Sequence, residues 1–264
     1  MKLATNKKMS GLPYAALICQ MIFLVILNIT CRNWMIDYDS SSGMLHAVEM
    51  WNQHSLFPTQ YHYQTTLDLD SLAPLVAIFY GITKDIALAQ AIVNCLSMVM
   101  FVYVFHKIFK HLAEDAWAEA ITITLLLLPY TIGQLGDASM LFARASFYCV
   151  RVILPMLILS VLLDIKEKKK LWTYGLRLIL GLVWCFFAGM STGAYLLICG
   201  LAPFLLYEVL SWMLQKQEES RWQSLVYECA CVFFLLCGYG YSKHIGFEQK
   251  AASMMLVTGG KIPF

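Results

Sequence analysis

The chain contains repeated apolar stretches, each about as long as a helix that crosses a lipid bilayer. A transmembrane α-helix needs about 20 consecutive, mainly apolar residues, because each residue adds only about 1.5 Å of length. Of the 264 residues, 59% are hydrophobic and only 14% are charged. A soluble protein of this size needs more charged residues to cover its surface. The sequence therefore predicts an all-α integral membrane protein.

The apolar stretches predict about seven transmembrane helices. The first stretch follows three lysines, as a signal peptide would, but no cleavage site of small residues ends it, so we interpret it as an uncleaved helix. The apolar segment 71–83 is interrupted by Gly81 and is too short to span, so we expect it to lie at the interface or to re-enter the membrane. The predicted spans are Leu12–Ile29, Ile86–Val104, Trp117–Ile132, Phe147–Leu163, Trp172–Met190, Ala194–Leu214 and Ser224–Tyr241.

Basic residues predict the orientation of these helices, because loops rich in Lys and Arg stay in the cytoplasm. The densest basic cluster is Lys166–Lys170, and Lys107 follows the second span. Alternation from a cytoplasmic amino end places both in the cytoplasm. It leaves residues 31–71, 133–146 and 191–193 outside, with the last two facing the first loop. We expect a multi-pass protein of the plasma membrane with a large first extracytoplasmic loop that contains short interfacial helices.

The predicted first loop carries an acidic pair at the membrane edge, in the sequence Ile36-Asp37-Tyr38-Asp39. In an extended backbone, residues i and i+2 point to the same side, so both carboxylates could face one metal ion or one acceptor hydroxyl. Two acids in a loop are also often simply solvated, and their spacing does not decide between these interpretations. Further along the loop, Met44–Trp51 has the apolar spacing of a short amphipathic helix.

The residues after the acidic pair occur in an order found in one enzyme family. They are Gly43, Ala47, Trp51, Leu56-Phe57-Pro58, Tyr61, Tyr63, Leu72-Ala73-Pro74-Leu75 and a span that starts at Asp85. This order resembles the amino-terminal part of the GT-C superfamily of membrane glycosyltransferases, in the branch of protein mannosyltransferases and lipid A aminoarabinose transferases. The resemblance covers residues 12–110, and the later helices are similar by topology only. It implies one transmembrane domain over residues 1–264, shorter than full members of the family and so divergent or truncated at the carboxyl end.

The resemblance implies a glycosyltransferase that moves a sugar from a polyprenyl-phosphate donor to an extracytoplasmic acceptor. Asp37 or Asp39 would be the catalytic carboxylate and act as general base on the acceptor hydroxyl. The leaving phosphate needs cationic stabilisation, for which Arg144 and Arg151 are candidates because a guanidinium matches phosphate oxygens. Arg151 could instead pair with Asp137 or extend to the lipid headgroups.

Other polar and aromatic residues of the loop are candidates for acceptor or substrate binding. An aromatic ring with a polar group suits a sugar or an isoprenoid headgroup. A divalent cation is left open, and no other cofactor is indicated. The candidates are Glu49, Trp51, Tyr61, His62, Tyr63 and Asp68.

Two other function classes compete with the enzyme. The first is a non-catalytic or degenerate membrane subunit that holds a protein partner. The second, less favoured, is a transporter, because transporters place charges near the bilayer midplane, whereas Arg177 and Glu228 are expected near the starts of their helices. The net charge of +2 gives no basic patch for nucleic acid. The 9 cysteines have no disulfide or metal spacing and are interpreted as packing residues.

Overall fold

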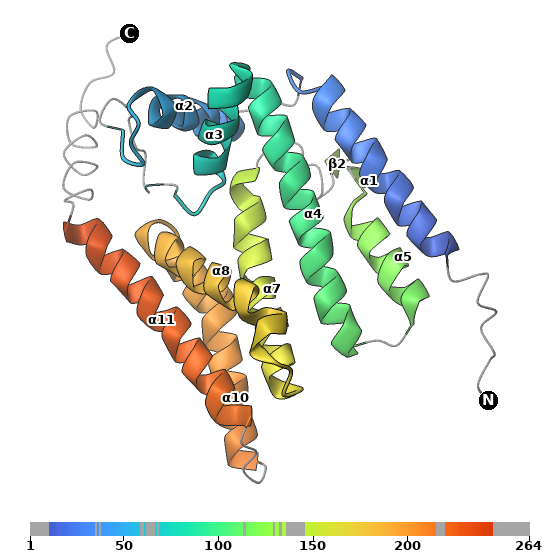
Figure 1. Cartoon of the computed structure of the whole chain (residues 1–264), viewed down its shortest axis with the longest axis vertical. Coiled ribbons are helices and arrows are strands. Elements are labelled where there is room, and N and C mark those ends of the chain that lie inside the picture. The colour runs from blue at the N-terminus through green and yellow to red at the C-terminus, as the bar shows by residue number, and fades with distance from the viewer. Residues whose placement is uncertain are drawn as a thin grey trace. The chain divides into compact units, whose positions relative to one another are not determined.

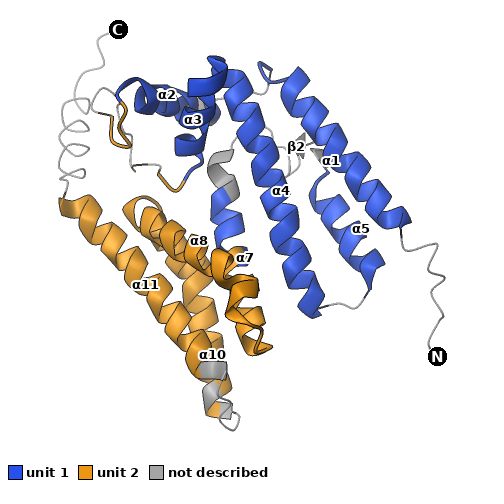
Figure 2. Ribbon diagram, viewed as in Figure 1, with its two compact units in different colours: residues 1–53, 71–156 blue, residues 54–70, 157–264 orange. Residues whose placement is uncertain are grey.

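The computed structural model describes residues 11–34, 36, 38–58, 61, 67, 69–112, 115–128, 130–131, 134–135, 146–214 and 220–244. These residues are almost entirely helical (Figure 1). The exception is a short antiparallel pair of strands, β1 (Tyr130–Thr131) and β2 (Gln134–Leu135). The chain divides into two compact units, residues 1–53 with 71–156 and residues 54–70 with 157–264 (Figure 2).

Five helices in the described part of the chain are long and apolar enough to cross a membrane. Many of their large apolar side chains are exposed; Phe23 and Phe233, for example, are 48% and 63% exposed. Exposure of many large apolar side chains on long helices is unfavourable in water and is normal against lipid. The helices therefore indicate a multi-pass membrane protein. They span Leu12–Thr30 (α1), Ile86–Leu112 (α4), Leu171–Met190 (α8), Gly193–Ser211 and Trp222–His244.

The remaining apolar segments differ in part from the prediction. The predicted span 117–132 is helical only as α5 (Ala116–Leu126), because Pro129 disfavours helical backbone in the residue before it. Gly81 does not interrupt its segment, since α3 runs through it from Ala73 to Thr83. With 11 residues, α3 is too short to span, as predicted. The predicted span 147–163 lies within α7 (Ser146–Lys166).

In the first unit, α1 packs on α4 and α5, and a polar chain joins α1 to α4. The amide of Asn94 donates to the side-chain oxygen of Asn28 at 3.2 Å, and Gln90 donates to Asn94 at 2.9 Å. All three residues are buried. At one end of the pair, Arg32 meets Asp85 at 3.3 Å, and Asp85 also accepts the Leu88 amide at 3.0 Å, which helps to begin α4. These contacts fix α1 against α4 where apolar packing alone is weakly directional.

The helix predicted at Met44–Trp51 is confirmed and is longer, as α2 (Tyr38–Asn52). It packs on α3, which in turn packs on α4. Its buried face consists of apolar side chains such as Met44 and Met50, together with His46. Burial disfavours the charged imidazolium and lowers the pKa of His46 to about 4.

The buried imidazole of His46 is expected to make stability depend on pH. Its pKa is about 4 in the folded protein and about 6.5 in an unfolded chain. The contribution of neutral His46 to the free energy of unfolding is therefore fully present above pH about 6.5. It falls as the pH drops toward 4, by about 3 kcal/mol in total. Thermal unfolding of detergent-solubilised protein should show a lower Tm at acidic pH, and His46→Leu should lose most of this dependence.

The matched control is the exposed His54, whose φ of 48° is left-handed. Asparagine tolerates this backbone, so His54→Asn should keep the wild-type pH profile. An unchanged acid-induced loss of stability in His46→Leu would show that other groups cause it.

In the second unit, α8 packs closely along α11 (Ser220–His244). Their backbones touch at two glycines: a Cβ on Gly189 would overlap the carbonyl oxygen of Leu235, and a Cβ on Gly238 would overlap that of Phe186. Small residues at such crossings let membrane helices approach closely. After α8, the short helix α9 (Gly193–Leu196) continues through one π-helical turn into α10 (Ala202–Leu214).

Candidate functional site

Of the acidic pair at the start of the predicted first loop, the structure describes only the backbone of Asp39. Tyr38 and Asp39 are the first residues of α2, so the backbone at Asp39 is helical and the predicted extended stretch is wrong at this position. The same-side argument assumed an extended backbone at both residues, so the placing of both carboxylates on one side stays a prediction. The helix dipole favours an acidic residue in the first turn, which is consistent with α2 starting this early. Asp37 lies outside the described residues.

Two predicted substrate-binding residues lie on α2. The ring of Trp51 packs directly on Gly81 of α3, where any Cβ would overlap it, and the Lys84 ammonium stands 5.0 Å from the ring centroid. Glu49 accepts a hydrogen bond of 2.9 Å from Gln53. Trp51 therefore joins α2 to α3 and forms a cation–π contact, which is sufficient to account for its presence. Its binding of a sugar stays a prediction.

Three described residues of segment 54–70, near its two ends, contact α8, the turn after it and α11, which lie in the same unit. The hydroxyl of Thr192 donates to the Asp70 carboxylate, and the Trp184 indole donates to the Asp70 carbonyl at 3.4 Å. The Leu69 amide donates to the Ser191 hydroxyl at 3.0 Å. The centroid of the Phe57 ring lies 6.4 Å from the centroid of the Tyr241 ring on α11. Leu69 and Asp70 thus lie at the turn 191–193, whereas the position of the loop and the turn outside the membrane stays a prediction.

The other predicted site residues are placed only in part. Tyr61 is buried. Arg151 lies in the second turn of α7 and is half-buried, so the donor-phosphate role and the alternative partners both stay predictions. Outside the described residues are His62, Tyr63, Asp68, Asp137 and Arg144.

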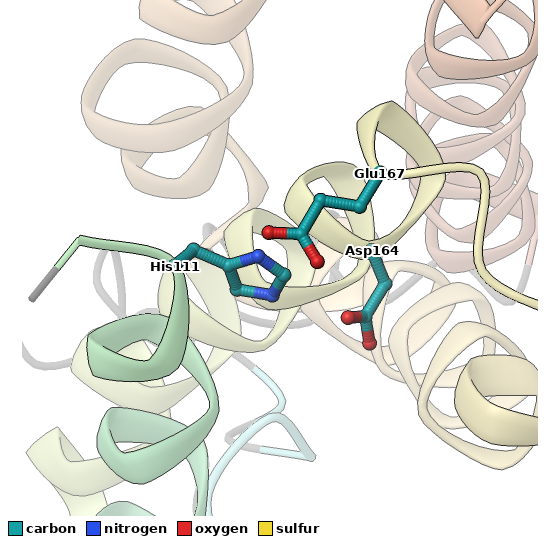
Figure 3. A group of neighbouring side chains, drawn as sticks. All are labelled: His111, Asp164 and Glu167. Atoms are coloured by element: carbon teal, nitrogen blue, oxygen red, sulfur yellow. The ribbon is translucent and has the colours of Figure 1, made fainter. Parts of the chain in front are cut away.

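A buried ionic network, not predicted from the sequence, lies where α7 ends and α8 begins. The guanidinium of Arg177 donates to the Asp164 carboxylate and, at 2.9 Å, to the Ser160 hydroxyl. Arg177 and Asp164 are only 4% and 3% exposed. Lys169 adds a second ion pair to Asp164 at 2.6 Å and reaches Glu167 at 3.0 Å. Figure 3 shows Asp164 and Glu167 at this end of α7.

The network keeps Asp164 and Lys169 charged. Burial alone would raise the pKa of Asp164, but hydrogen bonds and charges from Lys169 and Arg177 outweigh burial and lower it below its ordinary value. Partial burial likewise opposes the charge on Lys169, yet its hydrogen bonds to Asp164 and Glu167 raise its pKa. Two carboxylates and two cations balance, so this network is well suited to hold α7 against α8.

A second group of charges lies beside this network. Lys166 pairs with Glu208 of α10 at 2.5 Å, and its ammonium stands 4.3 Å from the centroid of the Tyr207 ring. Glu228 of α11 is fully buried and lies within electrostatic range of both Lys166 and Glu208. It was expected near the start of its helix, but α11 begins earlier than predicted, at Ser220, which puts Glu228 in the third turn.

A sequence signal for these groups exists. Asp164 ends an apolar stretch directly before the basic cluster 166–170. Arg177 follows seven residues after this cluster, near the start of the next apolar stretch. The basic cluster was used only to orient the helices. Opposite charges at the facing ends of two consecutive helices also predict an ion pair between them.

The divalent cation stays a prediction. Within either unit taken alone, the described residues contain no group of three His, Cys, Asp or Glu side chains close enough to share a metal ion. The resemblance to GT-C enzymes rests on the order of residues between positions 12 and 110. No family model, curated protein or solved structure matches the chain.

Proposed function

We propose that the chain is a membrane glycosyltransferase that moves a sugar from a polyprenyl-phosphate donor to an extracytoplasmic acceptor. The observation that carries this proposal is the anchoring of the carboxyl end of segment 54–70, where Asp70 binds Thr192 and Trp184. A long polar segment held in place at helix ends is typical of a binding loop on a rigid scaffold. The residue order of the GT-C family runs through this same segment.

The proposal includes the orientation predicted from the sequence, with about seven spans and a cytoplasmic amino end in the plasma membrane. Contacts within the second unit support it. Asp70 meets the turn after α8, whereas Lys169 precedes the first residue of that helix. The 20 residues of α8 separate these points by about 30 Å, the thickness of the hydrocarbon core. The anchored loop and the basic cluster thus lie at opposite ends of one membrane-length helix.

In the proposed reaction, Asp37 or Asp39 accepts the proton of the acceptor hydroxyl as its oxygen attacks the sugar. Arg144 and Arg151 stabilise the leaving polyprenyl phosphate. The acceptor is bound by Glu49, Trp51, Tyr61, His62, Tyr63 and Asp68.

Transfer of radiolabelled sugar from a panel of polyprenyl-phosphate donors is expected in membranes that carry the wild-type chain. Replacing the base with its neutral amide should lower the rate by about 100-fold or more, because proton removal is lost. We expect this loss in either Asp37→Asn or Asp39→Asn, with the other variant keeping most of the activity. Chelation followed by addition of Mg²⁺ or Mn²⁺ measures the metal requirement in the same assay.

The control variant is Asp115→Asn. Asp115 accepts the Trp117 amide at 2.9 Å as the N-cap of α5, on the side proposed to be cytoplasmic, and asparagine caps equally well. Its activity should match that of the wild type. Absence of transfer from every donor by well-expressed, folded wild type would contradict the enzyme and favour the non-catalytic subunit.

A further inference from the structure

Three charged residues of α7, α10 and α11 do not balance. We call Lys166, Glu208 and Glu228 the Glu228 cluster. Lys166 is paired with Glu208, which is 6% exposed. Glu228 is fully buried, and neither of its carboxylate oxygens has a hydrogen-bond partner among the described residues. With all three groups ionised, the cluster carries one negative charge more than its one cation neutralises.

The neighbouring network gives an internal comparison. Asp164 and Glu167 are matched by Lys169 and Arg177, and both oxygens of Asp164 are bonded. This network needs no further ligand. In the Glu228 cluster, by contrast, α11 carries a buried carboxyl group with no hydrogen-bond partner among the described residues and no compensating charge.

The other charged groups that follow, on the neighbouring helices, already have partners. From α8, Arg177 is bound to Asp164 and Ser160. From α10, Glu208 holds Lys166 of α7, whose ammonium also lies over the Tyr207 ring. The π-helical turn brings only Cys199, which is exposed. Among the side chains that the structure describes, none therefore offers Glu228 a cation of its own.

A buried, unpaired carboxylate is costly in an apolar environment, and the usual solution is neutralisation by a bound proton. A metal ion would need several oxygen ligands, whereas a proton needs one. We propose that the Glu228 cluster is a binding site for one proton, carried by the Glu228 carboxyl. When the proton leaves, Lys166 is shared between two carboxylates, so proton binding is coupled to the Lys166–Glu208 ion pair. This site is separate from the proposed transfer site and does not depend on it.

Labelling with dicyclohexylcarbodiimide tests the proposal, because this apolar reagent adds to protonated carboxyl groups. The full-length protein in liposomes is treated at several pH values, and the modified residues are identified by mass spectrometry. Glu228 should be labelled at pH about 6, and labelling should fall about tenfold or more by pH about 9 as the proton is lost. Infrared spectroscopy should show a carboxylic-acid C=O band that is absent in Glu228→Gln.

Two variants distinguish a proton site from simple burial. Glu208→Gln frees Lys166 to pair with Glu228, so labelling of Glu228 should fall about tenfold at pH about 6. The matched control Glu167→Gln, at an exposed carboxylate of the balanced network, should leave Glu228 labelling unchanged.

Absence of both the label and the infrared band in folded wild type would overturn the proposal. Unchanged labelling in Glu208→Gln would overturn the coupling to the ion pair. Protection of Glu228 by sodium chloride but not by choline chloride would replace the proton with a sodium ion. None of these outcomes depends on sugar transfer, so failure of the glycosyltransferase proposal is distinguishable from failure of this one.

Discussion

Alanine at Gly189 or at Gly238 is expected to disrupt the packing of α8 against α11. At each position the new Cβ would overlap a backbone carbonyl of the facing helix, Leu235 for Gly189 and Phe186 for Gly238. Backbone cannot rotate away as a side chain does, so the two helices must separate. Overpacking of this kind costs about 3 kcal/mol or more, and separation also weakens apolar packing along the rest of the pair.

The stability of detergent-solubilised protein, followed by thermal unfolding and gel filtration, measures this effect. Gly240→Ala is the matched control, because a Cβ at Gly240 of the same helix α11 meets nothing within 4 Å. This control should be neutral or slightly stabilising, since alanine is the better helix former. Equal Tm values for Gly240→Ala and Gly238→Ala would contradict the close crossing of the helices.

Loss of the Arg177 guanidinium is expected to have a similarly large effect. Arg177→Met leaves the buried Asp164 carboxylate without its guanidinium partner. Removing one member of a buried ion pair costs about 3–5 kcal/mol, because the remaining charge is not solvated. The folded pKa of Asp164 lies below its ordinary value, so the stability from this network is present above the ordinary carboxyl pKa and is lost as the pH falls through the folded one.

A double-mutant cycle tests whether the loss of stability in Arg177→Met comes from the Asp164 carboxylate that has lost its partner. Asp164→Leu combined with Arg177→Met removes both charges. This double variant should be more stable than the single variant Arg177→Met, by about 2 kcal/mol or more. Lys169→Met, at a residue that is 37% exposed, should cost much less. Additive effects of the two single substitutions would show that Asp164 and Arg177 do not interact.

Much of the fold could be predicted from local patterns. The ends of α1 and α8 agree with the apolar stretches to within one residue, and the helix at Met44–Trp51 was recognised from its spacing. One error came from overlooked local chemistry and one from a tertiary contact. Pro129 shortens α5, and Gly81 does not break α3 because Trp51 packs on it and favours the absence of a side chain.

The sequence by itself determined which segments are helices and which of them suit a membrane, because helix formation and transfer into lipid depend on residues that are neighbours along the chain. Only the tertiary structure decided that Asp164 binds Arg177, that Asp70 meets Thr192 and that Gly189 touches the backbone of Leu235. Each of these contacts depends on how helices are rotated and shifted against each other. Apolar periodicity constrains that rotation weakly when lipid, like the protein interior, accepts apolar side chains.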